Sequence, residues 1–141
     1  KDGGVLCAID LDTVMNSTSL NDFGDAIRSY ANTGEEDDRD LSRVGMSLDM
    51  FRAYTEGYLS QRAKQLTAPE IDHLAFSARY ITFEQVLRFL MDYIDGDTYY
   101  KIKYPEHNLV RTRAQYKLLR SMEEQYGTMC DIVRETVAKY R

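Results

Sequence analysis

The stretch TAPEIDHLAFSARYITFEQVLRFLMDYIDGD, residues 67–97, decides the fold class of this chain. Thr67 followed by Glu70 three residues later is a capping-box pattern, which is typical of a helix N-terminus. Asp95-Gly96-Asp97 is a stop signal at the other end. The pattern predicts a helix that runs from residue 67 to Ile94, with an interruption near residues 80–82, where β-branched side chains occur.

Most of the remaining sequence also has helical patterns. The apolar spacing predicts helices over 21–31, 47–63, 108–125 and 128–140. Residues 4–10 have the composition of a β-strand, and Gly3-Gly4 suits a hairpin turn whose other strand precedes Lys1. Residues 32–46 are rich in charge and predict a linker with solvated acids. We therefore expect a mainly α fold with one short N-terminal strand or hairpin remnant.

Composition excludes several classes of function. The chain has 141 residues, which is enough for one domain with its own core, and its net charge is −5. An acidic chain is not expected to be attracted as a whole to nucleic acid or to an anionic membrane. No apolar run approaches the roughly 20 residues that span a bilayer. The two cysteines lack metal-ligand spacing, and we expect a reduced, cytoplasmic protein.

The opening segment VLCAIDLDTVM, residues 5–15, delivers two carboxylates at the end of the expected strand. Asp10 and Asp12 match the DxDx[TV] signature of haloacid-dehalogenase-like phosphotransferases, but the chain has none of the further strands that such a parallel sheet requires. Two other interpretations stay open on spacing alone. The acids either hold a divalent metal, as at the strand end of kinase-like enzymes, or cap the following turn.

Four segments, in this order, carry a resemblance over nearly the whole chain. They are AIDLDTVM (8–15), LNDFGDAIRSYANTGEED (20–37), ARYITFEQVLRFLMDYIDGDTYYKI (78–102) and HNLVRTRAQYKLLRSME (107–123). Together they resemble the C-terminal part of sugar kinases of the aminoglycoside-phosphotransferase-like superfamily, and among these the N-acetylhexosamine 1-kinases. The resemblance implies that residues 1–141 form one mostly helical subdomain of a protein-kinase-like C-terminal lobe.

Roles for five residues follow from that resemblance. It implies that Asp10 binds Mg²⁺, that Asp12 joins the metal shell, and that Asp22 braces the catalytic loop through hydrogen bonds. It also implies that Arg88 and Tyr99 lie near the sugar. From the residues alone, Asp22 is equally a helix N-cap. Arg88 alone is equally the middle of a solvated ion-pair ladder on a helix face, with acids four residues away on either side, and Tyr99 is equally a core or interface tyrosine.

The catalytic loop of such a kinase is missing from these residues. No HxDxxxxN-like stretch supplies the Asp and Asn that orient the attacking hydroxyl and hold metal. We therefore predict a fragment that is inactive by itself, whose parent uses Mg²⁺ and ATP and whose partners are an N-acetylhexosamine-like sugar and the missing N-terminal part. The alternative is a non-catalytic helical module, or a fragment that self-associates as a homo-oligomer through its unpaired strand and uncovered helix faces.

Other candidate sites are weaker. His73 and His107 are far apart in sequence and lack an HExxH-type pattern, which argues for ordinary surface and loop-end roles. A locally basic stretch over residues 101–120 is typical of a solvated helix face in an acidic protein. A metal site within residues 35–38 would need a defined turn that nothing in the sequence demands.

Overall fold

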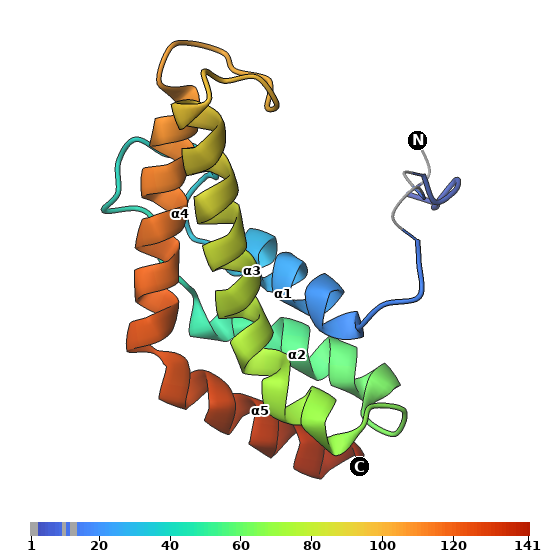
Figure 1. The fold of residues 1–141 in the computed structure, drawn as a ribbon. Coiled ribbons are helices and arrows are strands. Elements are labelled where there is room, and N and C mark those ends of the chain that lie inside the picture. Colours follow the sequence, from blue (N-terminus) through green and yellow to red (C-terminus); the bar gives the residue numbers. More distant parts are fainter. Residues whose placement is uncertain (1–2, 10, 12–13) are drawn as a thin grey trace.

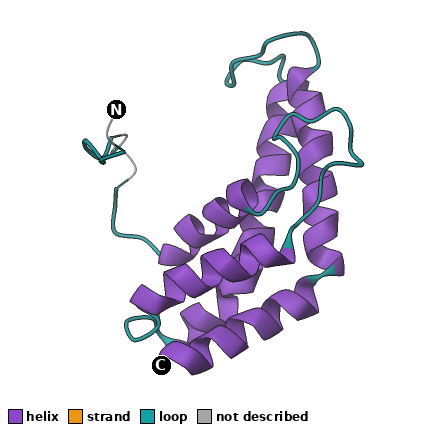
Figure 2. Ribbon diagram, turned by 180° about the vertical axis from the view of Figure 1, so that it is seen from behind, coloured by secondary structure: helices purple, strands orange, loops and turns teal. Residues whose placement is uncertain are grey.

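The computed structural model describes residues 3–9, 11 and 14–141, and its regular secondary structure there is helical (Figures 1 and 2). The helices are α1 (Ser19–Tyr30), α2 (Leu48–Arg62), α3 (Ala68–Ile94), α4 (His107–Glu124) and α5 (Tyr126–Tyr140). The expected mainly α fold is confirmed. Among the described residues, no helix combines the length and the apolar character needed to cross a bilayer.

Side-chain caps start three of these helices. The hydroxyl of Thr67 accepts a hydrogen bond from the Glu70 N–H at 3.4 Å, and the Glu70 carboxylate accepts from the Thr67 N–H at 2.8 Å. The predicted capping box is therefore confirmed. Ser47 caps α2 by accepting from the Met50 N–H. Thr18 caps α1, so that helix begins two residues earlier than predicted.

α3 continues without interruption through residues 80–82, so the predicted interruption there was wrong. β-branched residues cost a helix only a few tenths of a kcal/mol each, on the order of 0.5. Thr82 is buried, and its hydroxyl donates to the Ala78 carbonyl oxygen at 2.7 Å. Tertiary packing thus outweighs local preference. The last two helices meet at Gln125, two residues before the predicted junction at Gly127, which lies inside α5.

The predicted strand at residues 4–10 was wrong for its described part. Residues 4–9 form no strand, and these side chains are exposed. A strand requires a neighbouring strand to satisfy its backbone groups, and this part of the chain has none beside it. The only bridge among the described residues joins Asn32 and Met46, at the two ends of the segment predicted as a linker.

The helices form a bent bundle around one continuous core. Figure 1 shows α3 and α4 lying side by side along the long axis, while α1, α2 and α5 gather around the N-terminal half of α3. Every helix contributes to the core, represented by Phe23, Phe51, Leu74, Leu118 and Ile132. Fully burying one such side chain stabilises a fold by about 1.5–3 kcal/mol.

Gly24 sets the distance between α1 and α3. A Cβ atom at this position would lie 2.5 Å from the Ser77 carbonyl oxygen and 2.8 Å from Cγ1 of Ile81. Real contacts of this kind essentially never fall below about 3 Å, so any larger residue would force the helices apart. The glycine thus lets the two backbones approach closely.

Candidate functional site: a hollow at the end of α3

A shallow, open hollow of about 420 Å³ lies between the last turns of α3 and the loop that follows them. Arg88 and Glu84 come from the helix, and Tyr99 and Tyr100 come from the loop. In the sequence, the helix-stop signal at residues 95–97 lies between these two pairs. The turn at Gly96, with φ of 89°, nevertheless folds the loop back against the helix. The hollow therefore combines one cation and two aromatic rings with three acids, which are Glu84, Asp92 and Asp95.

Arg88 and Tyr99, which sequence analysis placed near a sugar, share this hollow. The guanidinium carbon of Arg88 lies 5.8 Å from the centroid of the Tyr99 ring and 5.6 Å from that of Tyr100. These distances fall within the range of cation–π attraction. Tyr99 is 74% exposed, so its ring and hydroxyl are open to a ligand.

The predicted ion-pair ladder on α3 is only half formed. A nitrogen of Arg88 lies 3.9 Å from a carboxylate oxygen of Glu84, at the limit of an ion pair between two half-exposed side chains. Asp92 does not continue the ladder, because its side chain is buried and turns toward the loop. The prediction of a solvated carboxylate at position 92 was therefore wrong.

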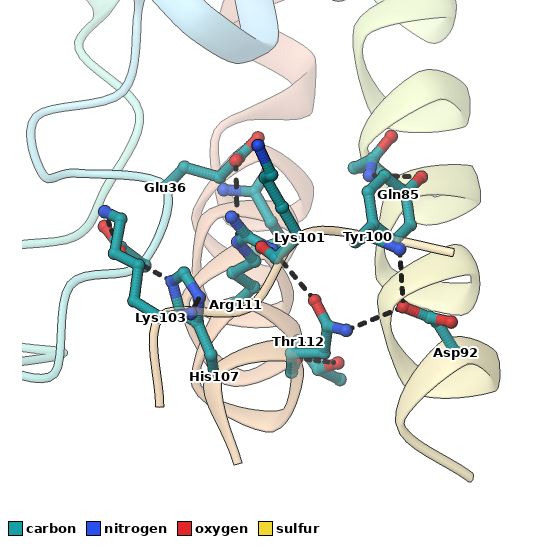
Figure 3. Close-up of polar contacts among 12 residues, drawn as sticks. Glu36, Gln85, Asp92, Tyr100, Lys101, Lys103, His107, Arg111 and Thr112 are labelled. Atoms are coloured by element: carbon teal, nitrogen blue, oxygen red, sulfur yellow. Dashed lines mark hydrogen bonds and ion pairs between the residues drawn. The ribbon is translucent and has the colours of Figure 1, made fainter. Parts of the chain in front are cut away.

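Asp92 instead fixes the backbone of the loop (Figure 3). One carboxylate oxygen accepts from the Tyr99 N–H at 2.8 Å, and the other accepts from the Tyr100 N–H at 2.9 Å and from the Asn108 amide at 2.7 Å. Burial opposes ionisation of this carboxyl, but the backbone donors outweigh burial and lower the pKa of Asp92. The two tyrosines of the hollow are thus held by a buried, ionised side chain.

Asn108 extends this network from α4. Its amide donates to Asp92 and, at 2.8 Å, to Asp97, and its carbonyl oxygen accepts from Arg111 at 2.9 Å. The guanidinium of Arg111 also lies 5.2 Å from the centroid of the Phe89 ring. Because both polar groups of the Asn108 side chain are used, the network ties the loop to α3 and α4 at once.

A second part of the network comes from the segment predicted as a solvated linker, residues 32–46. Asp37 accepts from Nε2 of His107 at 2.8 Å and from the Lys103 ammonium at 3.3 Å (Figure 3). His107 is fully buried, and its Nδ1 accepts the Lys103 backbone N–H, so the ring proton is on Nε2. The hydrogen bond from His107, helped by Lys103, lowers the pKa of Asp37 against the opposing effect of burial.

Glu36 joins the same segment to α1 and α4. It lies 2.9 Å from a nitrogen of Arg28 and 3.9 Å from a nitrogen of Arg111. The side chains of both arginines are mostly buried. The prediction of solvated acids in this segment was therefore wrong for Asp38, which is buried beside Arg43, and for Asp37, which is partly buried against His107. Glu36 stays 44% exposed, as a solvated acid would, although it also pairs with the two arginines.

The remaining predicted site residues are not brought to the hollow. Asp22 is exposed in the first turn of α1, where Thr18 and not Asp22 is the N-cap. It lines a different hollow, of about 450 Å³, beside residues 14–19. Asp10 and Asp12 lie outside the described residues. Within the described part of the chain, no group of three or more His, Cys, Asp or Glu side chains could hold a metal ion, residues 35–38 included.

Sequence reasoning missed the residues that organise the hollow. Asp92, Asn108 and His107 are polar side chains on helical patterns, which argues for surface positions, and their burial depends on partners 7 to 70 residues away. One signal was available in the sequence. Asn108 follows directly on His107 at the start of a helix, and polar side chains at such a position often form hydrogen bonds with the adjoining loop.

No protein-family model matches this sequence.

Proposed function

We propose that this chain is the C-terminal helical part of an ATP-dependent sugar phosphotransferase of the N-acetylhexosamine 1-kinase kind. The observation that carries the proposal is that Arg88 and Tyr99, which the resemblance assigns to sugar binding, lie together in one hollow. In the kinase, the chain supplies sugar-binding residues and metal-binding carboxylates. By itself it is inactive, because it contains no catalytic loop.

The hollow suits a sugar on chemical grounds. The guanidinium of Arg88 offers several N–H donors to ring hydroxyls or to an acetamido oxygen, and the exposed face of Tyr99 offers an apolar surface for sugar C–H groups. Asp92 and Asn108 hold the tyrosine backbone in place before any ligand arrives. Such preorganisation lowers the entropy that binding costs.

The transfer itself requires groups from elsewhere in the kinase. The anomeric hydroxyl oxygen bonds to the γ-phosphorus of ATP, the bond from that phosphorus to the β–γ bridging oxygen breaks, and ADP leaves. The hydroxyl proton passes to a carboxylate of the catalytic loop. Mg²⁺ neutralises phosphate charge in this reaction, and carboxylate oxygens such as those of Asp10 and Asp12 are its preferred protein ligands. Asp22 is assigned to bracing the catalytic loop.

A titration of this chain with N-acetylglucosamine and N-acetylgalactosamine, followed by amide NMR, tests the sugar site. We expect shifts confined to the hollow, including the amides of Tyr99 and Tyr100, and their loss in Arg88→Ala and Tyr99→Ala. Tyr116→Ala, at an exposed tyrosine on α4, is the matched control and should bind as the unmodified chain does. Absence of shifts with these sugars and with simple hexoses would overturn the sugar site.

An ADP-release assay tests the second part of the proposal. This chain alone, with Mg²⁺, ATP and sugar, should release no ADP above background. Turnover by the isolated chain would contradict the assignment of the catalytic groups to another part of the kinase.

A second candidate function, a non-catalytic interaction module, is favoured by a different observation. A row of exposed apolar side chains follows α3 along its length.

A further inference from the structure

One face of α3 is apolar and exposed over most of the length of the helix. Six large side chains on this face are between 43% and 66% exposed. The helix that carries them is the longest among the described residues. The six side chains are Phe76, Tyr80, Phe83, Leu87, Met91 and Ile94, and this face is named the α3 seam. Steps of three or four residues place all of them along one side of the helix.

The size of the α3 seam suits a protein interface. From residue 76 to residue 94 the helix rises about 27 Å. Fully exposed aromatic side chains present roughly 150–250 Å² each, so six half-exposed large side chains present on the order of 600 Å². This approaches the roughly 800 Å² per partner of a standard protein interface and reaches the upper end of the apolar patches found on monomers.

We propose that the α3 seam binds the α3 seam of a second copy of this chain, with the two helices antiparallel. Glu84 and Arg88 flank the seam on the same side, one turn apart, and each side chain is about half exposed. An antiparallel pair centred between residues 83 and 87 places Glu84 of each copy beside Arg88 of the other. The apolar side chains pair in the same register, with Phe83 beside Leu87.

The charges favour the antiparallel arrangement over the parallel one. A two-fold axis perpendicular to the helices brings matching flanks together, so the Glu84–Arg88 flank meets its own copy and the ion pair between Glu84 of one copy and Arg88 of the other forms twice. In a parallel pair this flank meets the opposite one, where Arg79 is already engaged by Glu123 and by the ring of Tyr126. Self-complementarity of this kind is what an isologous interface requires.

Pairing and sugar binding are tested separately, although the two surfaces share Glu84, Leu87, Arg88 and Met91. An associated pair covers the hollow, so sugar and second copy would compete for it. Failure of pairing would leave the sugar site untouched, and failure of sugar binding would leave the pairing untouched.

Sedimentation equilibrium of the 141-residue chain over a range of micromolar concentrations tests the pairing. The average mass should rise with concentration from the chain mass of 16.4 kDa toward twice that value. Phe83→Glu, at the centre of the seam, should weaken association by at least about tenfold, because it buries a charge against an apolar side chain. Tyr116→Glu, equally exposed on α4, should leave association unchanged.

Two charge reversals test the register without touching the apolar side chains. Glu84→Arg alone and Arg88→Glu alone should each associate more weakly, because each pair then sets like charges side by side. An equimolar mixture of the two variants should associate more strongly than either one alone, since only the mixed pair restores opposite charges. Circular dichroism confirms that each variant keeps its helix content.

Three results would overturn the proposal. These are a monomer at every concentration, equal association of Phe83→Glu and Tyr116→Glu, and a mixture of the charge variants no stronger than its components.

Discussion

The two ends of the α3–α4 pair are held together by different forces. Around the N-terminal half of α3 the contacts are apolar, and the buried ring of Phe23 lies 5.1 to 6.3 Å from the rings of Tyr58, Tyr54 and Phe51. Around the C-terminal half of α3 and the start of α4, a polar network centred on Asp92 takes over, and it holds the loop of the hollow.

This difference shows which part of the molecule fixes the positions of its side chains most closely. Apolar packing is non-directional and tolerates small shifts, whereas hydrogen bonds to a buried carboxylate fix both distance and angle. The apolar end therefore supplies most of the stability, and the polar end sets the position of the residues that line the hollow. Each end should fail in its own way when altered.

The largest effect is expected at the apolar end. Phe23→Ala removes a fully buried ring from a cluster of four aromatic side chains, and we expect a loss of about 3–5 kcal/mol in the free energy of unfolding. Urea denaturation followed by circular dichroism measures it. Tyr116→Ala, at an exposed ring, should change stability by less than about 0.5 kcal/mol. A similar small loss for Phe23→Ala would contradict an apolar origin of stability at this end.

Asn108→Ala tests the polar end. It removes a donor from the buried Asp92 and an acceptor from Arg111, and hydrogen bonds to charged groups contribute about 1.5–3 kcal/mol each. We expect a net loss of about 3 kcal/mol, the lower end of the sum of these two bonds, because water can replace part of what the amide provided. Amide hydrogen exchange should speed up at Tyr99 and Tyr100 while the core of α2 stays protected.

Exposed Asn21→Ala, in the first turn of α1, is the control for that substitution and should be nearly neutral. Uniform acceleration of exchange in Asn108→Ala, reaching α2 and α5, would show instead that the two ends unfold as one unit.

Acid should weaken the polar end, where two carboxylates are hydrogen-bonded in their ionised form. The folded-state pKa values of Asp92 and Asp37 are both lowered, so their contribution to stability is complete above the unfolded carboxyl pKa of about 4. It is lost as the pH falls through the lower folded values, because the unfolded chain then binds more protons. The free energy of unfolding, measured from about pH 6 to pH 3, should fall less steeply in Asp37→Asn than in the unmodified chain. Parallel curves would exclude a role for Asp37 in acid sensitivity.

The smallest effect is expected from the exposed ion pairs between α2 and α5. Arg52 lies 2.9 Å from Glu135, and both side chains are largely exposed. Arg52→Ala should cost less than about 0.5 kcal/mol, since solvent screens such pairs. Thermal unfolding at low and high salt checks this, and a large, salt-sensitive loss would mean that charge as well as apolar packing holds this end.

Local signals in the sequence predicted much of the fold. The capping box of Thr67 and Glu70 depends on residues within one turn and is present as predicted. Ser47, at the start of the helix predicted over 47–63, proves to be the cap of α2. The strand at residues 4–10 was predicted wrongly, because a strand needs a neighbour that periodicity cannot supply. The break in α3 was predicted wrongly too, because burial of Thr82 outweighs its modest local cost.

The residues of the candidate site also divide into those that the sequence indicated and those that depend on distant partners. Arg88 and Tyr99, which the resemblance assigns to sugar binding, were singled out from the order of motifs, and the fold does bring them together. The residues that hold the loop were not predicted, because Asp92, Asn108, Asp37 and His107 act in pairs whose members lie far apart in the sequence.

By itself, the sequence determined which segments are helices and where the capping box of α3 lies, since hydrogen bonds and side-chain contacts within a helix reach only three or four residues. Only the tertiary structure decided which acids are buried and ionised, which loop is rigid and which face of α3 stays open. Those properties depend on what lies beside each side chain in space, and a buried carboxylate is stable only where its donors converge.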